Sequence, residues 1–268
     1  MNNYVVFHLH TMLSNPVTNI DSVNNYKQYI DRAKELGMKA IAFTEHGSTL
    51  AWLHKKEYAE DNGLKYIHGV EVYVTANINE KIRDNFHVVL LAANFDGFKE
   101  INTLVSKSFN RSEVKTIDNI ERFYYQPRIS FDELINTSDN IIITTACIAG
   151  ILGSNNQLYD PFIQFLNKNQ HRCFLEIQHH HTKEQVLHNQ KLYDLHKKHG
   201  LKLIAGTDTH SLDKKYAEGR LVLQKAKNIR FDNEEGWDLT FKSYDDLVDS
   251  YKQQKALPQD VYLQAIHN

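Results

Sequence analysis

The chain has 268 residues, of which 41% are hydrophobic and 24% charged, and its formal net charge is −2 with histidine neutral. This composition is typical of a globular protein and argues against a basic protein that coats nucleic acid. No apolar run is long enough to cross a membrane, and the two cysteines, Cys147 and Cys173, cannot build a disulfide framework. We expect no secretory signal, a cytoplasmic setting and no membrane partner.

Predicted strands and helices alternate along the chain. Hydrophobic patterns predict, in chain order, a strand at 5–9, a helix at 22–36, a strand at 39–43, a helix at 51–61, strands at 66–74 and 86–92, a helix at 98–109, a polar irregular stretch at 110–128, a strand at 140–145, a helix at 161–167, a strand at 173–178, a helix at 183–198, a strand at 202–205, and a short strand with two helical pieces at 239–268. Gly37 and Gly200 follow two of the helices, where glycine commonly ends a helix.

This alternation predicts a parallel sheet with helices around it. No Gly-x-Gly-x-x-Gly pattern follows the first strand, and no reversal of strand order is evident. We therefore expect one α/β domain over 1–268, built as a closed or nearly closed barrel rather than a doubly wound sheet.

Two histidines, His8 and His10, close the first predicted strand. Residues i and i+2 of a strand point to the same side, so both imidazoles face one point at the strand's carboxyl end. Neutral imidazole is a common ligand of zinc, iron and manganese. Alone, the pair is better explained as two structural histidines.

Other residues that can bind metals follow later strands: Glu45, His46, Glu71, His87, Cys147, Asp208 and His210. In a βα barrel the carboxyl ends of the strands converge on one face. We therefore expect nine such side chains to hold two or three divalent ions that share a bridging carboxylate. Each residue has another interpretation. Asp208 and His210 could cap a helix, Glu45 and His46 could be exposed turn residues, and Cys147 could be a small buried apolar residue.

The motifs His8–Thr11, Thr44–Gly47, Gly69–Glu71 and Thr207–His210 together resemble the PHP (polymerase and histidinol phosphatase) superfamily. Within it, the chain resembles the PHP domain of bacterial DNA polymerase III alpha subunits over nearly its whole length. The resemblance implies a distorted (β/α)7 barrel with a trinuclear metal centre at the carboxyl ends of its strands. Residues 239–268 resemble the connection between the PHP domain and the polymerase, and the helical pattern still running at Asn268 is compatible with a longer polypeptide.

The same resemblance implies a set of metal ligands. His8, His10, Glu71 and Asp208 would hold the first ion. Glu71 would bridge to a second ion held by His87 and Cys147, and Glu45, His46 and His210 would belong to the third. Zn, Mn or Fe would fit these ligands, and Cys147 favours zinc at the second site.

The activity implied by the resemblance is metal-dependent hydrolysis of phosphoesters, as a 3′–5′ exonuclease on DNA related to replication proofreading. His8, His10, Glu71, Asp208 and His210 would be the catalytic residues. The expected partners are a DNA strand end and replication proteins, in the cytoplasm of a bacterium or a phage-infected host. Two alternatives are a small-molecule phosphatase of the histidinol phosphatase type and a non-catalytic, metal-stabilised N-terminal domain of a replicative polymerase. The run 179–181, three histidines after a predicted strand, is expected to be a solvated loop.

Overall fold

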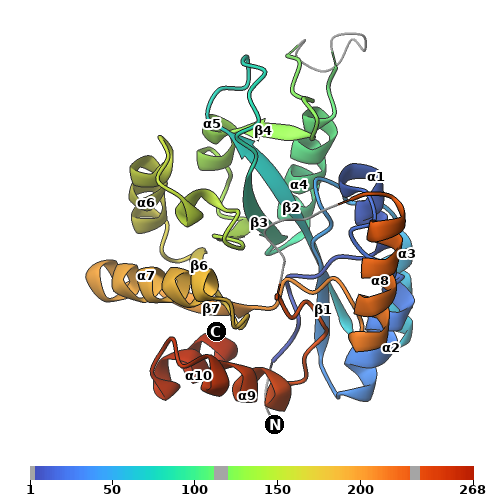
Figure 1. Cartoon of the computed structure of the whole chain (residues 1–268). Helices are drawn as coiled ribbons and strands as arrows, with labels where there is room; N and C mark the ends of the chain where they lie inside the picture. The colour runs from blue at the N-terminus through green and yellow to red at the C-terminus, as the bar shows by residue number, and fades with distance from the viewer. Residues whose placement is uncertain (1–3, 112–119, 230–235) are drawn as a thin grey trace.

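A curled seven-stranded sheet forms the centre of the protein, as a half-barrel with helices around it (Figure 1). The computed structural model describes residues 4–111, 120–229 and 236–268. The strands are β1 (Ala40–Phe43), β2 (Lys65–Thr75), β3 (Phe86–Ala92), β4 (Arg128–Ser130), β5 (Ile141–Thr144), β6 (Cys173–Gln178) and β7 (Lys202–Gly206). Their order is β1-β2-β3-β5-β6-β7, and β4 pairs with β2. The predicted α/β class and distorted barrel are confirmed.

The prediction of an all-parallel sheet is wrong at β3. This strand pairs antiparallel with β2 on one side and with β5 on the other, whereas the remaining pairs are parallel. Only residues 76–85 join β2 to β3, fewer than the dozen or more that a parallel crossover needs. As a result, the beginning of β3 lies at the same edge of the sheet as the end of β2.

The predicted first strand is an extended segment without a regular ladder. It forms one isolated bridge, from Leu9 to Thr209. The amide of Ala42 in β1 donates to the carbonyl of Val6 at 3.1 Å, and the amide of His10 donates to the carbonyl of Thr209 at 2.8 Å. The segment therefore lies between β1 and the chain that follows β7, and it bridges these two ends of the curled sheet.

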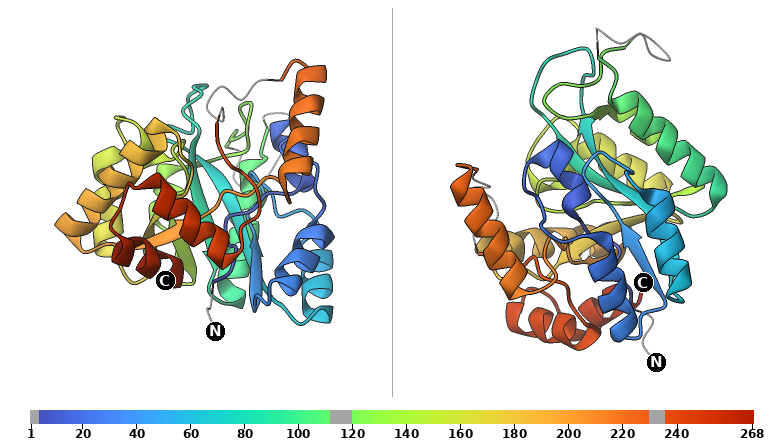
Figure 2. Two further views of the ribbon diagram at one scale, coloured as in Figure 1. Left: turned by 60° about the horizontal axis from the view of Figure 1, so that its bottom comes forward. Right: turned by 90° about the vertical axis from the view of Figure 1, so that its right-hand side faces the viewer.

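Helices cover the outer face of the sheet. Figures 1 and 2 show α2, α3 and α8 on one flank, α6 and α7 on the other, and α9 and α10 at the end of the molecule where both termini lie. The helices are η1 (Met12–Ser14), α1 (Asn15–Thr18), α2 (Tyr26–Glu35), α3 (Trp52–Asp61), α4 (Phe95–Ser108), α5 (Phe131–Ile135), η2 (Ile151–Gly153), α6 (Tyr159–Lys168), α7 (Lys183–His199), α8 (Lys214–Ala226), α9 (Tyr244–Gln254) and α10 (Gln259–His267). None of these helices, within the part of the chain described, is long and apolar enough to cross a membrane.

Several helix boundaries differ from the predicted ones. The helix predicted at 22–36 begins only at Tyr26, because Asn25 and Gln28 form a capping box at its start. Helix α8 was not predicted, and it ends before residues 230–235, which lie outside the described residues. The predicted irregular stretch at 110–128 is described only in part, since 112–119 lie outside the described residues too.

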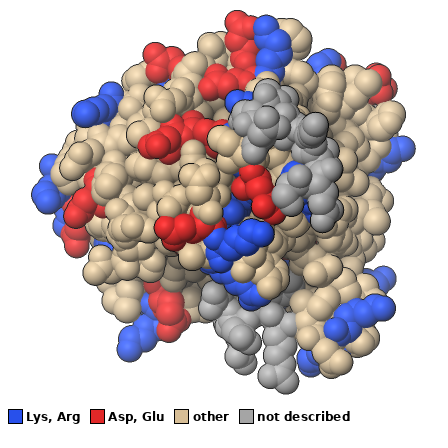
Figure 3. Space-filling model, turned by 90° about the horizontal axis from the view of Figure 1, so that it is seen from above, with Lys and Arg blue, Asp and Glu red and all other residues tan. Residues whose placement is uncertain are grey.

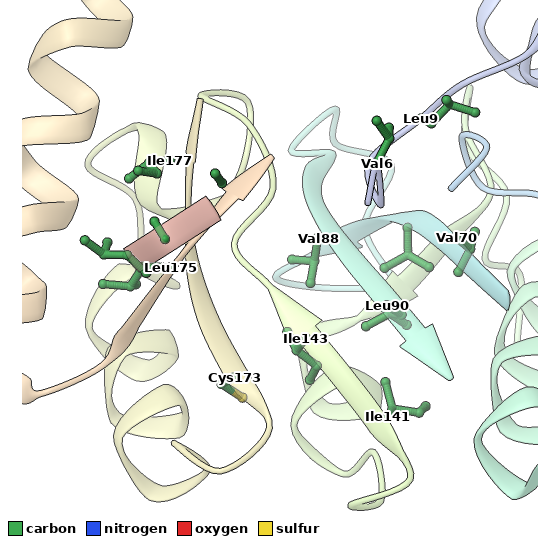
Figure 4. Close-up of a cluster of buried hydrophobic side chains, with 14 of the residues drawn as sticks. Val6, Leu9, Val70, Val88, Leu90, Ile141, Ile143, Cys173, Leu175 and Ile177 are labelled. Atoms are coloured by element: carbon green, nitrogen blue, oxygen red, sulfur yellow. The ribbon is translucent and has the colours of Figure 1, made fainter. Parts of the chain in front are cut away.

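Buried apolar side chains form a separate cluster on each face of the sheet. Val70, Val88, Leu90 and Ile143 belong to a large buried cluster that includes residues of the surrounding helices (Figure 4). Successive strand residues face opposite sides, so Glu71 lies on the other face. A smaller buried cluster occupies that inner face: Phe7, Ala42, Val89, Leu91 and Ala146. These apolar side chains form a floor under the polar residues at the strand ends.

Candidate metal centre

Most of the side chains predicted to bind metal meet at one edge of the sheet. His46 follows β1, Glu71 lies in β2, and Asp208 follows β7, so all three are near the carboxyl ends of strands. His87 is at the beginning of β3, and because β3 runs antiparallel, this residue reaches the same edge. His46 also pairs with Glu71 in an isolated bridge. The fold therefore brings side chains from distant parts of the sequence into one cluster.

The first group comprises His8, His10, Glu71 and Asp208. The Nε2 atoms of His8 and His10 each lie 3.2 Å from Oδ1 of Asp208. They also lie 3.4 Å from the carboxylate of Glu71, at Oε1 and Oε2 respectively. One potential ligand atom from each of the four residues lies within 4.8 Å of the others, so a single ion between them could contact all four.

Two further groups share members with the first. His46, Glu71 and His87 form one, with Glu71 oxygens 2.9 Å from Nδ1 of His46 and 3.0 Å from Nδ1 of His87. The other adds Asp21 and His210 to His10 and His46, and Nε2 of His210 lies 3.3 Å from Oδ1 of Asp21. Glu71 links the first two groups. The arrangement can accommodate more than one ion.

Hydrogen bonds fix the direction in which two of the imidazoles face. Nδ1 of His8 lies 2.6 Å from Oε1 of Glu176, and Nδ1 of His210 lies 2.8 Å from the backbone carbonyl of Asp208. Both partners are acceptors, so Nδ1 carries a proton and Nε2 is the nitrogen that a metal in the cluster would contact. Glu176 was not among the predicted site residues, although its position in β6 places it behind His8.

Buried atoms without hydrogen-bond partners test whether the cluster fits a metal. Among the described residues, these atoms include Nε2 of His8, Nε2 of His10, Oδ1 of Asp208 and Oε2 of Glu71. Lone pairs of imidazole and carboxylate that face one another at 3.2 to 3.4 Å repel unless a proton or a metal cation lies between them, so each such pair offers a place for either. The donor set, nitrogen and carboxylate oxygen, suits zinc, manganese or iron.

The electrostatics of the cluster favour the metal-binding protonation state at Asp208 and His10. Burial alone would raise the pKa of Asp208, but His8 and His210 more than offset this and keep the pKa of its carboxyl below the ordinary value. Burial, with His46 and His210 close by, lowers the pKa of His10 to about 4. At neutral pH Asp208 is therefore ionised and His10 is neutral, the forms that bind metal.

At His8 burial opposes protonation, but Glu176, Asp208 and Glu71 outweigh it and raise the pKa of the imidazole well above its ordinary value, so a metal would displace a proton there.

Glu45 is not brought into the cluster, and Asp21 is found beside His46 and His210 instead. Both oxygens of Glu45 already accept hydrogen bonds from neighbouring groups. Asp21 lies in the irregular loop between α1 and α2. Its backbone amide donates a hydrogen bond to Oδ1 of Asn15 at 2.7 Å. Because this loop is not a strand end, the pattern that identified the other residues carries no signal for Asp21.

Cys147 lies at the margin of the cluster. It is buried, and its Sγ is 3.7 Å from Nδ1 of His87. Burial, followed by the negative charges of Asp208 and Glu71, raises the pKa of its thiol well above the ordinary value. The thiolate form would therefore require a cation beside it.

The expectation of a solvated loop at 179–181 is wrong for the first two histidines. His179 and His180 are fully buried, whereas His181 is exposed. The side chain of Gln254 in α9 donates to the carbonyl of His180 at 2.6 Å, and the ring of Trp237 stacks on His180 with centroids 4.7 Å apart. Contacts from the C-terminal part of the chain therefore bury this loop.

Comparisons with known proteins give a consistent picture. A model of the PHP domain family matches residues 7–180. The DNA polymerase III subunit alpha of Borreliella burgdorferi is 28% identical over 227 residues, which cover 80% of this chain and 19% of that protein. The corresponding subunit of Helicobacter pylori strain 26695 is 30% identical over 222 residues, covering 76% of this chain and 17% of that protein. The chain thus spans about a fifth of the length of these relatives.

A solved structure from Bifidobacterium adolescentis, named as a metal-dependent phosphoesterase, has a similar fold. The two align with a TM-score of 0.51 and 16% sequence identity, covering 77% of this chain and 87% of that chain. At this identity the likeness concerns the fold.

Proposed function

Because this chain belongs to the PHP domain family, we propose that it is a metal-dependent phosphoesterase that removes nucleotides from the 3′ end of DNA. The observation that carries this proposal is the set of buried, unpartnered imidazole and carboxylate atoms that face one another at the strand ends. Divalent ions bound there would lower the pKa of a bound water and neutralise charge on the phosphate.

The residues divide into three proposed ligand sets. His8, His10, Glu71 and Asp208 form the first, and Glu71 with His87 and Cys147 forms the second. The third comprises Asp21, His46 and His210, with Asp21 in place of Glu45. Zn²⁺, Mn²⁺ and Fe²⁺ all fit these ligands, and the thiol of Cys147 favours zinc in the second set.

The surrounding residues keep these ligands ready to bind. Glu176 and the carbonyl of Asp208 hold the Nδ1 protons of His8 and His210, so in both rings Nε2 is the nitrogen that would bind metal. The apolar floor below the site excludes water from that side, which strengthens the electrostatic interactions of the carboxylates.

DNA is the proposed substrate because the curated relatives named above are DNA polymerase subunits. Figure 3 looks onto the molecule from above, at the end toward which β2 points in Figure 1, and shows acidic and basic side chains interspersed over the described part of that face. A strand end would therefore be held mainly at the metals rather than along a broad basic surface. Replication proteins in the cytoplasm of a bacterium or an infected host are the proposed partners.

The test compares substrates on the same protein. The metal-stripped chain is reloaded with Zn²⁺, Mn²⁺ or Fe²⁺ and given single-stranded DNA labelled at the 3′ or the 5′ end, histidinol phosphate, and a generic phosphomonoester. We expect release of mononucleotides from the 3′ end only with metal, and its loss in Asp208→Asn and His10→Ala. As a control, Glu100→Gln removes a carboxylate that accepts hydrogen bonds from Ser138 away from the site, and it should retain activity.

Other outcomes decide against the proposal. Cleavage of histidinol phosphate without cleavage of DNA would identify a small-molecule phosphatase. Metal-dependent stabilisation with no hydrolysis of any substrate would identify a non-catalytic domain. Full activity after metal removal would exclude the metal mechanism itself.

A further inference from the structure

Glu45 is held by four hydrogen bonds beside the metal cluster. Its Oε2 accepts from the backbone amide of Thr11 at 2.8 Å and from Oγ of Ser14 at 2.7 Å. Its Oε1 accepts from Oγ1 of Thr11 and from Nζ of Lys55, both at 2.7 Å. A carboxylate has about four lone-pair positions, so this pattern uses all of them. Glu45 has no free lone pair to offer to a metal.

We propose that Glu45 is a positioning residue that sets the tautomer of His10 through the hydroxyl of Ser14. This inference rests on the proposed function, since it concerns how the chain prepares one ligand for a metal. It assigns a role to the acidic residue of the Thr44–Gly47 motif other than that of a ligand.

The Ser14 hydroxyl has a single proton to donate. Ser14 donates this proton to Glu45, so it can only accept from its other neighbours. Those neighbours are Nδ1 of His10 at 3.4 Å and the backbone amide of His46 at 3.1 Å. The Ser14 oxygen therefore favours the Nδ1–H tautomer of His10, in which Nε2 is free for a metal. Nε2 lies 3.2 Å from Oδ1 of Asp208, so a metal there would replace the proton that this carboxylate otherwise attracts to Nε2.

Another acceptor near Nδ1 of His10 is too distant to set the tautomer in place of Ser14. Oδ2 of Asp21 lies 3.9 Å away, beyond hydrogen-bond distance. The backbone amide of His46 donates a hydrogen bond to the same Ser14 oxygen. One hydroxyl thus fixes the ring of His10 and the backbone of His46, and both residues belong to the cluster.

Lys55 of α3 makes this arrangement stable. The side chains of Lys55 and Glu45 are 2% and 1% exposed, and an unpaired carboxylate so deeply buried would be costly. The ammonium of Lys55 compensates the charge of Glu45 at Oε1, whereas Ser14 donates to the other oxygen, Oε2. Glu45 therefore stays ionised, and an ionised carboxylate is the acceptor that orients the Ser14 hydroxyl.

Two kinds of substitution separate a positioning residue from a ligand. In Glu45→Gln the amide can donate to Ser14, which frees the Ser14 proton and removes the preference for Nδ1–H in His10. We expect metal binding to weaken about 10–100-fold, with the number of ions per chain at saturation unchanged. Lys55→Met should weaken metal binding in the same direction. Asp21→Asn, which alters a proposed ligand, should instead lose one ion per chain.

The chain offers a matched control on the same helix. Lys56 and Glu60 form an exposed ion pair in α3, so Lys56→Met and Glu60→Gln should leave metal binding unchanged. Affinity is measured by competition with a chromophoric chelator, using Zn²⁺ as the probe, and stoichiometry by elemental analysis. Loss of one ion in Glu45→Gln, as in Asp21→Asn, would make Glu45 a ligand and overturn the inference. Unchanged affinity would overturn it as well.

A spectroscopic measurement keeps this test independent of the proposed function. In the zinc-loaded protein labelled with ¹⁵N-histidine, NMR should show the Nδ1–H proton of His10 exchanging slowly with solvent, and exchanging faster in Glu45→Gln. Equal exchange rates in both proteins would refute the relay, whether or not the protein hydrolyses any phosphoester. If Glu45→Gln does not fold, Ser14→Ala provides the same comparison, because it removes the hydroxyl and leaves Glu45 paired with Lys55.

Discussion

Replacing Glu176 by glutamine should weaken metal binding without unfolding the protein. Oε1 of Glu176 lies 2.6 Å from Nδ1 of His8, and both side chains are fully buried. A hydrogen bond to a charged group contributes about 1.5–3 kcal/mol. At about 1.4 kcal/mol per factor of ten, losing the charge while keeping an amide oxygen should reduce metal affinity by about tenfold to a hundredfold.

The measurement is a chelator competition on wild type and Glu176→Gln at the same pH, accompanied by thermal unfolding without metal. Glu100→Gln is the matched control, because Glu100 also accepts a serine hydroxyl but lies away from the cluster. The reasoning is refuted if Glu176→Gln binds zinc as tightly as wild type. It is also refuted if Glu100→Gln weakens binding equally.

Three further predictions concern packing and pH. A Cβ at Gly206 would lie 2.0 Å from Oε1 of Glu176, so Gly206→Ala should displace Glu176 and weaken metal binding. Gly219→Ala is the control, because Gly219 has open space around it, and chelator competition should show unchanged metal binding. Leu90→Ala, in the buried cluster, should lower the free energy of unfolding by about 2–5 kcal/mol in urea titrations. Burial lowers the pKa of His68 to about 4, so the unfolded chain binds more protons between about pH 6.5 and 4. The free energy of unfolding should therefore decrease as the pH is lowered through this range, and His68→Phe should reduce that decrease. An equal decrease in both proteins would contradict the lowered pKa of His68.

All strands except the three-residue β4 were predictable, because each carries its own local pattern. The bounds of β3 and β6 agree with the predicted ranges 86–92 and 173–178, since both are short segments rich in β-forming apolar residues. The direction of β3 was not predictable in the same way. It depends on which strands β3 pairs with, and those pairings join residues far apart in the chain.

The residues of the candidate site also differ in whether a local sequence pattern could identify them. His8, His10 and Asp208 follow from the sequence, because the carboxyl ends of strands share one edge of the sheet and a residue there needs no further information to be placed. Asp21 enters the cluster from an irregular loop whose position is set by contacts such as that of Asn15, and no local pattern encodes it.

By itself, the sequence determined the fold class, the positions of most strands and most of the side chains at the candidate metal site, because periodicity and strand-end chemistry are local properties. Only the tertiary structure decided that Glu45 is fully hydrogen-bonded beside Lys55, that Asp21 stands next to His46, and that Glu176 holds His8. Those outcomes depend on distances between residues separated widely in the chain, which are set when the sheet curls and its loops pack together.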